Sequence, residues 1–134
     1  MADMNQKIIE EFCANNGKVV GYFENMNLLL LHTTGAKSGQ PRLNPTAYIK
    51  DDDHLVIAAS KAGADNHPDW YINLRANSDV VVEVGIDKFA GRADITTEPE
   101  RTLLYTKLKS IYPGFADYEQ KTDRVIPVIT ISRR

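Results

Sequence analysis

The apolar segments of this chain are short, and most of them follow one another without an intervening helix. Extended segments are predicted at 28–34, 42–50, 54–60, 79–84, 88–96 and 126–132. Short turns join two neighbouring pairs, at Asp51-Asp52-Asp53 and at Gly85-Ile86-Asp87. Strands joined in this way pair antiparallel. The pattern therefore predicts an antiparallel sheet or small barrel, in contrast to the alternating strands and helices of a Rossmann fold.

Helical spacing of apolar residues marks segments at 3–16, 68–76, 98–110 and 115–120. At the start of the third segment, Thr97 and Glu100 have the spacing of a capping box, in which each side chain bonds a backbone N–H near the other. Leu103, Leu104 and Leu108 are expected to face inward from that helix. The expected fold class is α+β, with the helices outside the sheet.

Composition limits the classes of function. The chain has 134 residues, which fits one domain over residues 1–134, and its net charge is −2. Nucleic-acid binding requires a broad basic surface, so no nucleic-acid partner is expected. No apolar run approaches the roughly 20 residues of a membrane span, and stable membrane insertion is not expected. The first ten residues lack the cationic start and apolar core of an export signal.

The single cysteine, Cys13, is informative in two ways. One cysteine forms no internal disulfide, which fits a reducing compartment, so a cytoplasmic location is expected. Cys13 also lies beside Phe12 and four residues after Ile9, on the apolar face of the first predicted helix. Free cysteine is among the most buried residue types, so Cys13 is predicted to belong to the core.

The segment 28–45, LLLLHTTGAKSGQPRLNP, joins a buried strand to a loop rich in hydrogen-bond donors. Gly35 and Gly39 are expected to adopt positive φ angles that turn main-chain N–H groups towards a common point. Lys37 supplies a point charge, Arg42 a planar fork and Ser38 a neutral donor. Converging donors of this kind bind phosphate or carboxylate groups. The loop is a candidate anion site, with a solvated hairpin turn as the alternative.

A second block, 58–77, reads AASKAGADNHPDWYINLRAN and leads from a strand end into a helix. Lys61 lies where the strand emerges, a position from which its side chain can address a bound ring. Pro68 and Asp69 suit the first turn of a helix, whose N-terminus favours negative charge in a ligand. Trp70 and Leu74 are predicted to pack the helix onto the sheet as core residues.

The third block places three rings within seven residues, at Tyr112, Phe115 and Tyr118, around Pro113-Gly114. Such rings stack on planar, apolar molecules, and the Pro-Gly break would allow them to form a mobile wall over a pocket. The alternative is an aromatic patch that is packed permanently on the sheet. Both interpretations stay open at this point.

Several catalytic classes lack their signature residues. The loop is not a Walker A motif, because its lysine and serine precede the second glycine and an extended segment follows. The three histidines, His32, His54 and His67, show no paired ligand spacing, so no metal site is expected. The carboxylates are scattered, and no serine has the context of a nucleophile elbow. A hydrolase is therefore not indicated.

Together, the segments TTGAKSGQPRLNP, AASKAGADNHPDWYINLRAN and YPGFADYEQKTDRVIPV resemble the deazaflavin-dependent nitroreductase family, also described as coenzyme F-420-dependent quinone reductases. The resemblance covers nearly the whole chain from residue 28, in order, spacing and residue type. It implies an antiparallel split β-barrel with peripheral helices, of the kind that binds flavins. It also implies a bound coenzyme F-420 (8-hydroxy-5-deazaflavin), which serves as a hydride donor.

The resemblance implies a set of cofactor-binding residues in the loop, the flanking strands and the helix start. They are Ala36, Lys37, Ser38, Arg42, Leu43, Asn44, Pro45, Thr46, Ala47, Ala58, Ala59, Ser60, Lys61, Asp69, Trp70, Tyr71, Ile72 and Asn73. The substrate side would be formed by Tyr112, Phe115 and Tyr118. Family members often carry tyrosine where this chain has Phe115, so hydrogen bonding or proton donation to the substrate would fall to Tyr112, Tyr118 or water. No catalytic residue is assigned.

The expected function is transfer of a hydride from reduced F-420 to a small planar electrophile such as a quinone, an enone or a nitroaromatic compound. Lys37 and Arg42 would anchor the anionic tail of the cofactor, and Lys61 would lie near the ring. Two alternatives stay open: a non-catalytic carrier or sensor of a deazaflavin, flavin or haem-derived ligand, and a reductase that uses flavin mononucleotide (FMN). A homodimer is also compatible with the sequence.

Overall fold

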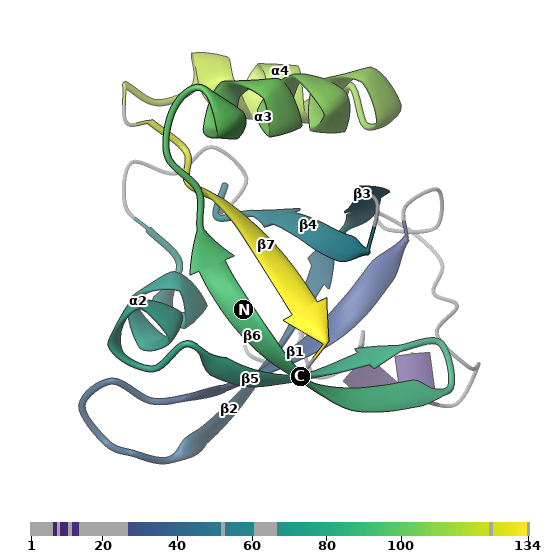
Figure 1. Cartoon of the computed structure of the whole chain (residues 1–134), viewed down its shortest axis with the longest axis vertical. Coiled ribbons are helices and arrows are strands. Elements are labelled where there is room, and N and C mark those ends of the chain that lie inside the picture. The colour runs from purple at the N-terminus through teal and green to yellow at the C-terminus, as the bar shows by residue number, and fades with distance from the viewer. Residues whose placement is uncertain are drawn as a thin grey trace.

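The computed structural model describes residues 7, 9, 10, 12, 13, 27–51, 53–60, 67–123 and 125–133. Residues 7, 9, 10, 12 and 13 are helical. The other elements are β1 (Leu28–Thr34), β2 (Pro41–Ala47), β3 (Ile49–Asp51), β4 (His54–Ala58), α2 (Asp69–Ala76), β5 (Asp79–Val84), β6 (Asp87–Ile95), α3 (Glu100–Ile111), α4 (Gly114–Gln120) and β7 (Val128–Arg133). Figure 1 shows α3 and α4 lying together beside one end of the strands, while α2 lies away from them.

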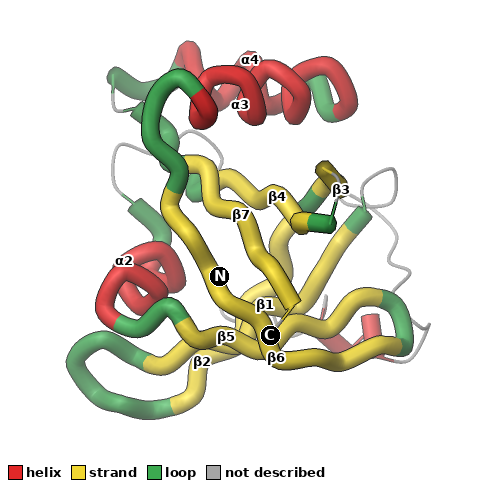
Figure 2. The backbone as a smooth tube through the Cα atoms, viewed as in Figure 1, coloured by secondary structure: helices red, strands yellow, loops and turns green. Residues whose placement is uncertain are grey.

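The described strands form one antiparallel sheet in the order β2-β1-β5-β6-β7-β4-β3. Its two edge strands, β2 and β3, are consecutive in the chain and are separated only by Tyr48. One segment therefore runs along both edges, and the sheet curls on itself into a half-barrel, as the tube in Figure 2 shows. This arrangement confirms the predicted α+β class with an antiparallel split barrel and peripheral helices.

Backbone and side-chain hydrogen bonds hold the bend at Tyr48. The Tyr48 amide donates to the carbonyl of Asn27 over 3.0 Å. The Tyr112 hydroxyl donates to the Tyr48 carbonyl over 2.9 Å and accepts from the Asn27 amide over 2.9 Å. Tyr112 is only 5% exposed and its bond to the Tyr48 carbonyl is buried, so losing that bond would leave a buried polar group unpaired. The corner of the barrel is thus fixed from the end of α3.

Alternating side chains divide the apolar residues between the two faces of the sheet. On β4, Ile57 points into the cluster that also contains Leu31 and Ile129 and that Trp70 and Leu74 of α2 cover. The neighbouring residues Val56 and Ala58 point into a second cluster on the opposite face. Leu104, Tyr105, Leu108, Tyr112 and Phe115 of α3 and α4 close that second cluster. The predicted core roles of Trp70 and Leu74 are confirmed.

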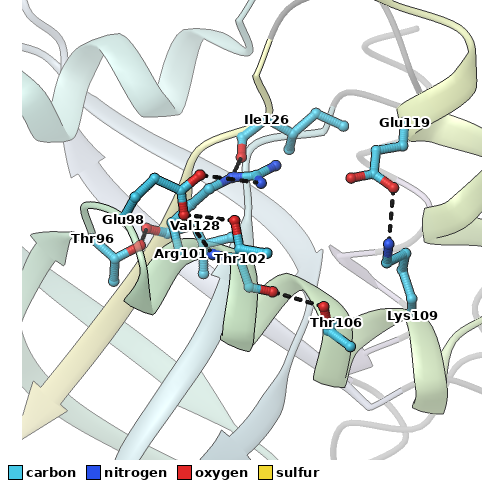
Figure 3. Close-up of polar contacts among 9 residues, drawn as sticks. All are labelled: Thr96, Glu98, Arg101, Thr102, Thr106, Lys109, Glu119, Ile126 and Val128. Atoms are coloured by element: carbon cyan, nitrogen blue, oxygen red, sulfur yellow. Dashed lines mark hydrogen bonds and ion pairs between the residues drawn. The ribbon is translucent and has the colours of Figure 1, made fainter.

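The start of α3 differs from the predicted capping box. The helix begins at Glu100, and Glu98 is the residue whose carboxylate caps it, by accepting from the amide and the hydroxyl of Thr102 over 2.9 and 2.6 Å. These bonds lower the pKa of the Glu98 carboxyl below its ordinary value. Arg101 donates to the Ile126 carbonyl over 2.9 Å, which ties the helix to the segment before β7 (Figure 3). The prediction that Thr97 caps with Glu100 was therefore wrong.

Two burial predictions were also wrong. Leu103 is 66% exposed, because α3 rests on the sheet through Leu104 and Leu108, and Leu103 lies about 100° around the helix from Leu104. Cys13 is exposed while its neighbour Phe12 is buried, for the same reason.

The corner bonds can be tested by replacing Tyr112 with phenylalanine. We expect Tyr112→Phe to lower the free energy of unfolding by about 1–3 kcal/mol, because the Asn27 amide and the Tyr48 carbonyl lose a shielded partner. Urea unfolding measures this change. Tyr118→Phe is the matched control, since its ring packs on the same cluster at the surface. Equal stabilities of the two variants would show that the corner does not depend on the Tyr112 hydroxyl.

The pH dependence of stability offers a second test of this region. Burial raises the pKa of Tyr48 above its ordinary value of 10.0, and the nearby Tyr112 raises it further. Above pH 10 the unfolded chain ionises this phenol more readily than the folded protein does, so the contribution of Tyr48 is complete below pH 10 and is lost as the pH rises through the folded pKa. In urea titrations, Tyr48→Phe should lose stability less steeply above pH 10 than the wild type. Parallel slopes would argue against a raised pKa.

Candidate functional site

A cleft of about 580 Å³ opens between the β1–β2 loop, β2 and α2. In Figure 2 that loop lies beside α2, at the lower left of the view. The residues that line the cleft are Gly35, Ala36, Lys37, Ser38, Arg42, Leu43, Asn44, Asp69, Ile72 and Asn73. Nine of them belong to the predicted cofactor-binding set. The structure therefore brings together two blocks of sequence that are about thirty residues apart.

The cleft carries two cations without a protein partner. Within the described residues, neither Lys37 nor Arg42 takes part in an ion pair, and both are exposed. Leu43 and Ile72 add apolar surface, and Ile72 is 46% exposed at the cleft. Asp69 is the only carboxylate among the lining residues. The cleft thus combines an anion-attracting wall with an apolar one, which suits a ligand with a charged tail and a flat ring.

The β1–β2 loop is folded tightly on itself. The amide of Gly35 donates to the carbonyl of Gln40 over 2.8 Å, and the amide of Gly39 donates to the carbonyl of Gly35 over 2.9 Å. The amide of Gln40 donates to the hydroxyl oxygen of Ser38 over 3.1 Å. These amides are therefore occupied within the loop. The predicted convergence of main-chain N–H groups on a ligand is wrong for them.

The lack of a side chain matters for different reasons at the two loop glycines. Gly39 adopts a φ of 69°, as predicted. Gly35 does not adopt a positive φ, which corrects that prediction. A Cβ at Gly35 would instead lie 2.5 Å from the hydroxyl oxygen of Ser38. Glycine at this position thus allows the Ser38 hydroxyl to approach this closely.

Asn73 joins α2 to this loop. Its side-chain oxygen accepts from the amide of Ala36 over 3.0 Å, and its side-chain nitrogen donates to the hydroxyl of Thr33 over 3.2 Å. Asn73 is 8% exposed and Thr33 is 4% exposed. Asn73 was among the predicted site residues, whereas the contact of Thr33 and the lining role of Gly35 were not predicted. No local pattern in the sequence identifies a contact between residues 40 positions apart.

The remaining predicted cofactor residues that the structure describes do not line the cleft. Pro45 and Thr46 are half-buried on β2, and the others with described side chains are buried. Tyr71 packs its ring 4.7 Å from the His67 ring, with the Arg75 guanidinium 5.7 Å from the Tyr71 ring centre. Lys61 lies outside the described residues. The described residues of the predicted set that do not line the cleft are Pro45, Thr46, Ala47, Ala58, Ala59, Ser60, Trp70 and Tyr71.

The three predicted substrate residues lie in a different place. Tyr112 and Phe115 are buried with Tyr105 in the cluster under α3 and α4, and Tyr118 packs against it. The Tyr105 hydroxyl donates to the Phe115 carbonyl over 2.7 Å, and the Phe115 and Tyr118 rings are 5.3 Å apart. None of the three lines the cleft. The alternative of a packed aromatic patch describes this arrangement, and the mobile wall does not.

The described part of the chain shows neither a metal-binding cluster nor a membrane-spanning helix. No group of three histidine, cysteine, aspartate or glutamate side chains gathers there in a way that would hold a metal ion. No described helix has the length and apolar character needed to cross a membrane.

Comparison with known proteins places these features in a family. The family model described as F420H(2)-dependent quinone reductase matches residues 5–132. An F420H(2)-dependent quinone reductase of Mycobacterium tuberculosis is 39% identical over 109 residues, which are 79% of this chain and 73% of the relative.

Two solved structures are also similar to this chain in both sequence and fold. A structure described as an F420-H2 dependent reductase is 36% identical, with a TM-score of 0.72 over 79% of this chain and 94% of that one. A second structure, described as a domain-swapped dimer, is 31% identical, with a TM-score of 0.74 over 98% of both chains. The chain belongs to the F420H(2)-dependent quinone reductase family.

Proposed function

We propose that this protein is an oxidoreductase that uses reduced coenzyme F-420 to reduce a small planar electrophile, such as a quinone, an enone or a nitroaromatic compound. When bound, the coenzyme supplies a hydride from C5 of its deazaflavin ring. Membership of the family supports the cofactor and the reaction class. The observation that carries the proposal is that Lys37 and Arg42, which form no ion pair within the described residues, share one cleft with apolar Leu43 and Ile72.

The donors in the cleft fit the tail of this cofactor. F-420 carries a phosphodiester and carboxylates, so it needs several positive or neutral donors spread along one wall. Arg42 offers a planar fork and Lys37 a mobile charge. The Ser38 hydroxyl accepts from Gln40 and keeps its own proton to donate. These three side chains hold the tail, while Leu43 and Ile72 exclude water from the face of the ring.

Several parts of the predicted site are carried forward as proposals. The other residues named by family resemblance, including Lys61, would contact the ring from strand ends and the helix start. Water is the proposed proton donor, because the Tyr112 hydroxyl is engaged at the corner and Tyr118 packs against the cluster under α3 and α4, away from the cleft lining. We further propose a single domain, a homodimer by analogy with the domain-swapped neighbour, and a cytoplasmic location.

Titration of the purified protein with F-420 and with FMN separates the cofactor alternatives. The longer polyanionic tail of F-420 makes more contacts with Lys37 and Arg42, so we expect F-420 to bind more tightly. Mixing the protein with reduced F-420 and menadione then distinguishes enzyme from carrier. Catalysed oxidation of F-420 supports the enzyme, and tight binding without turnover would support a carrier or sensor.

Replacing Arg42 with alanine tests the anion wall. Loss of a charge-assisted contact costs about 1.5–3 kcal/mol, so the Kd for F-420 should rise by roughly one to two decades. Stability to urea should change little, because Arg42 is exposed. Arg92→Ala is the matched control, since Arg92 is an exposed arginine on β6 that is absent from the cleft lining. An unchanged Kd in Arg42→Ala would mean that the tail binds elsewhere.

Replacing Gly35 with alanine tests the packing of the loop. The added Cβ would meet the Ser38 hydroxyl oxygen at 2.5 Å and displace it from the cleft wall. Because Ser38 would then no longer be placed to donate to the tail, we expect the Kd for F-420 to rise about tenfold. Gly114→Ala is the control, because a Cβ there finds its nearest neighbour at 4.0 Å. Equal affinities of the two variants would show that the position of Ser38 does not matter for binding.

A further inference from the structure

We infer that Asn73 is a positioning residue that sets the distance and orientation of the two cleft cations without acting through contacts of its own with the ligand. The inference deepens the proposed function and rests on it. The helix α2 forms one wall of the cleft. The Asn73 side chain also makes it the part to which the opposite, cation-bearing wall is attached.

The two hydrogen bonds of the Asn73 side chain are made to residues that neighbour the two cations. Its oxygen holds the amide of Ala36, which is the residue immediately before Lys37. Its nitrogen holds the hydroxyl of Thr33, and Thr33 is the β1 residue paired with Arg42 on β2. One planar group is therefore bonded next to the backbone of Lys37 and opposite the backbone of Arg42. A shift of this amide moves both cations relative to the cleft.

Few other side chains of this size perform the same task. The site needs an acceptor for a backbone N–H and a donor to a hydroxyl, in one plane and on a short stem. Asn73 and Thr33 are almost fully buried, so water does not replace a lost partner. Asp69, four residues earlier on α2, lies on the same face of the helix as Asn73.

This arrangement has a consequence for how an anion is held. The Ala36 amide is occupied by Asn73, and the amides of Gly35, Gly39 and Gln40 are occupied within the loop. Among residues 35–40, only the amides of Lys37 and Ser38 have no hydrogen-bond partner in the part of the chain that is described. Anion binding then relies on these two amides and on side chains, and the Ala36–Asn73 bond is kept when the ligand binds.

Hydrogen exchange of the Ala36 amide, followed by NMR in the absence of cofactor, tests the contact itself. We expect protection of this amide to fall at least tenfold in Asn73→Leu, which removes the acceptor. Asn73→Asp keeps an acceptor and should restore the protection. Asn77→Ala is the matched control, because Asn77 terminates the same helix and its side chain bonds only the Asp79 amide in the described structure.

Affinity and turnover test the functional role. We expect Asn73→Leu to raise the Kd for F-420 about tenfold, while kcat at saturating F-420 stays within twofold of the wild type. Thr33→Val removes one of the two bonds and should raise the Kd by a smaller factor. If Asn73→Leu does not fold, Asn73→Ser, whose hydroxyl is too short to span the gap, is measured in the same way.

Two results would overturn the inference. Loss of Ala36 protection with an unchanged Kd would show that the contact does not position the cations. A lower kcat with an unchanged Kd would show that Asn73 acts on the reacting groups directly. A wild-type protein that binds no F-420 would instead overturn the proposed function, and that outcome is recognised before any variant is compared.

Discussion

The strand that begins at Pro41 as one edge of the sheet continues, beyond a single residue, as the strand at the other edge. The bend between them is held by the Tyr112 hydroxyl, which bonds the backbone of both Asn27 and Tyr48. Because β1 starts next to Asn27 and β2 ends next to Tyr48, this contact fixes where the first hairpin leaves the barrel. The hairpin loop carries the cations, so the position of the site depends on a corner on the opposite face of the sheet.

From that corner, the hairpin extends towards α2 and meets it through Asn73. The hairpin provides cations and a serine, and the helix provides an apolar side chain and one carboxylate. The loop gains its rigidity from internal bonds between Gly35, Gly39 and Gln40, so its shape does not depend on the ligand. A preformed wall of this kind lowers the entropic cost of holding a long, flexible tail. The ordered loop is therefore the part of the protein that would hold the most flexible part of the ligand.

Local patterns predicted much of the fold. β1 and β5 have the predicted bounds, because alternation and flanking turn residues determine them. The break at Tyr48 was not predicted, since the bonds that impose it come from Asn27 and Tyr112. For the same reason, the aromatic residues of the third block were given a role at a pocket. Phe115 and Tyr118 lie on α4, and their packing depends on Tyr105, which lies on α3.

The candidate site shows the same division between local and distant information. The types of residue in the loop predicted an anion site, and the structure gathers them in one cleft with the start of α2. The loop sequence alone does not reveal that several of its own amides are already hydrogen-bonded, either within the loop or to Asn73.

The most direct test of the proposed site is a crystal structure of the protein with F-420. The account predicts the phosphate and carboxylates of the tail within hydrogen-bond distance of Lys37, Ser38 and Arg42, with the Ala36–Asn73 bond intact. A tail bound away from these side chains would contradict it.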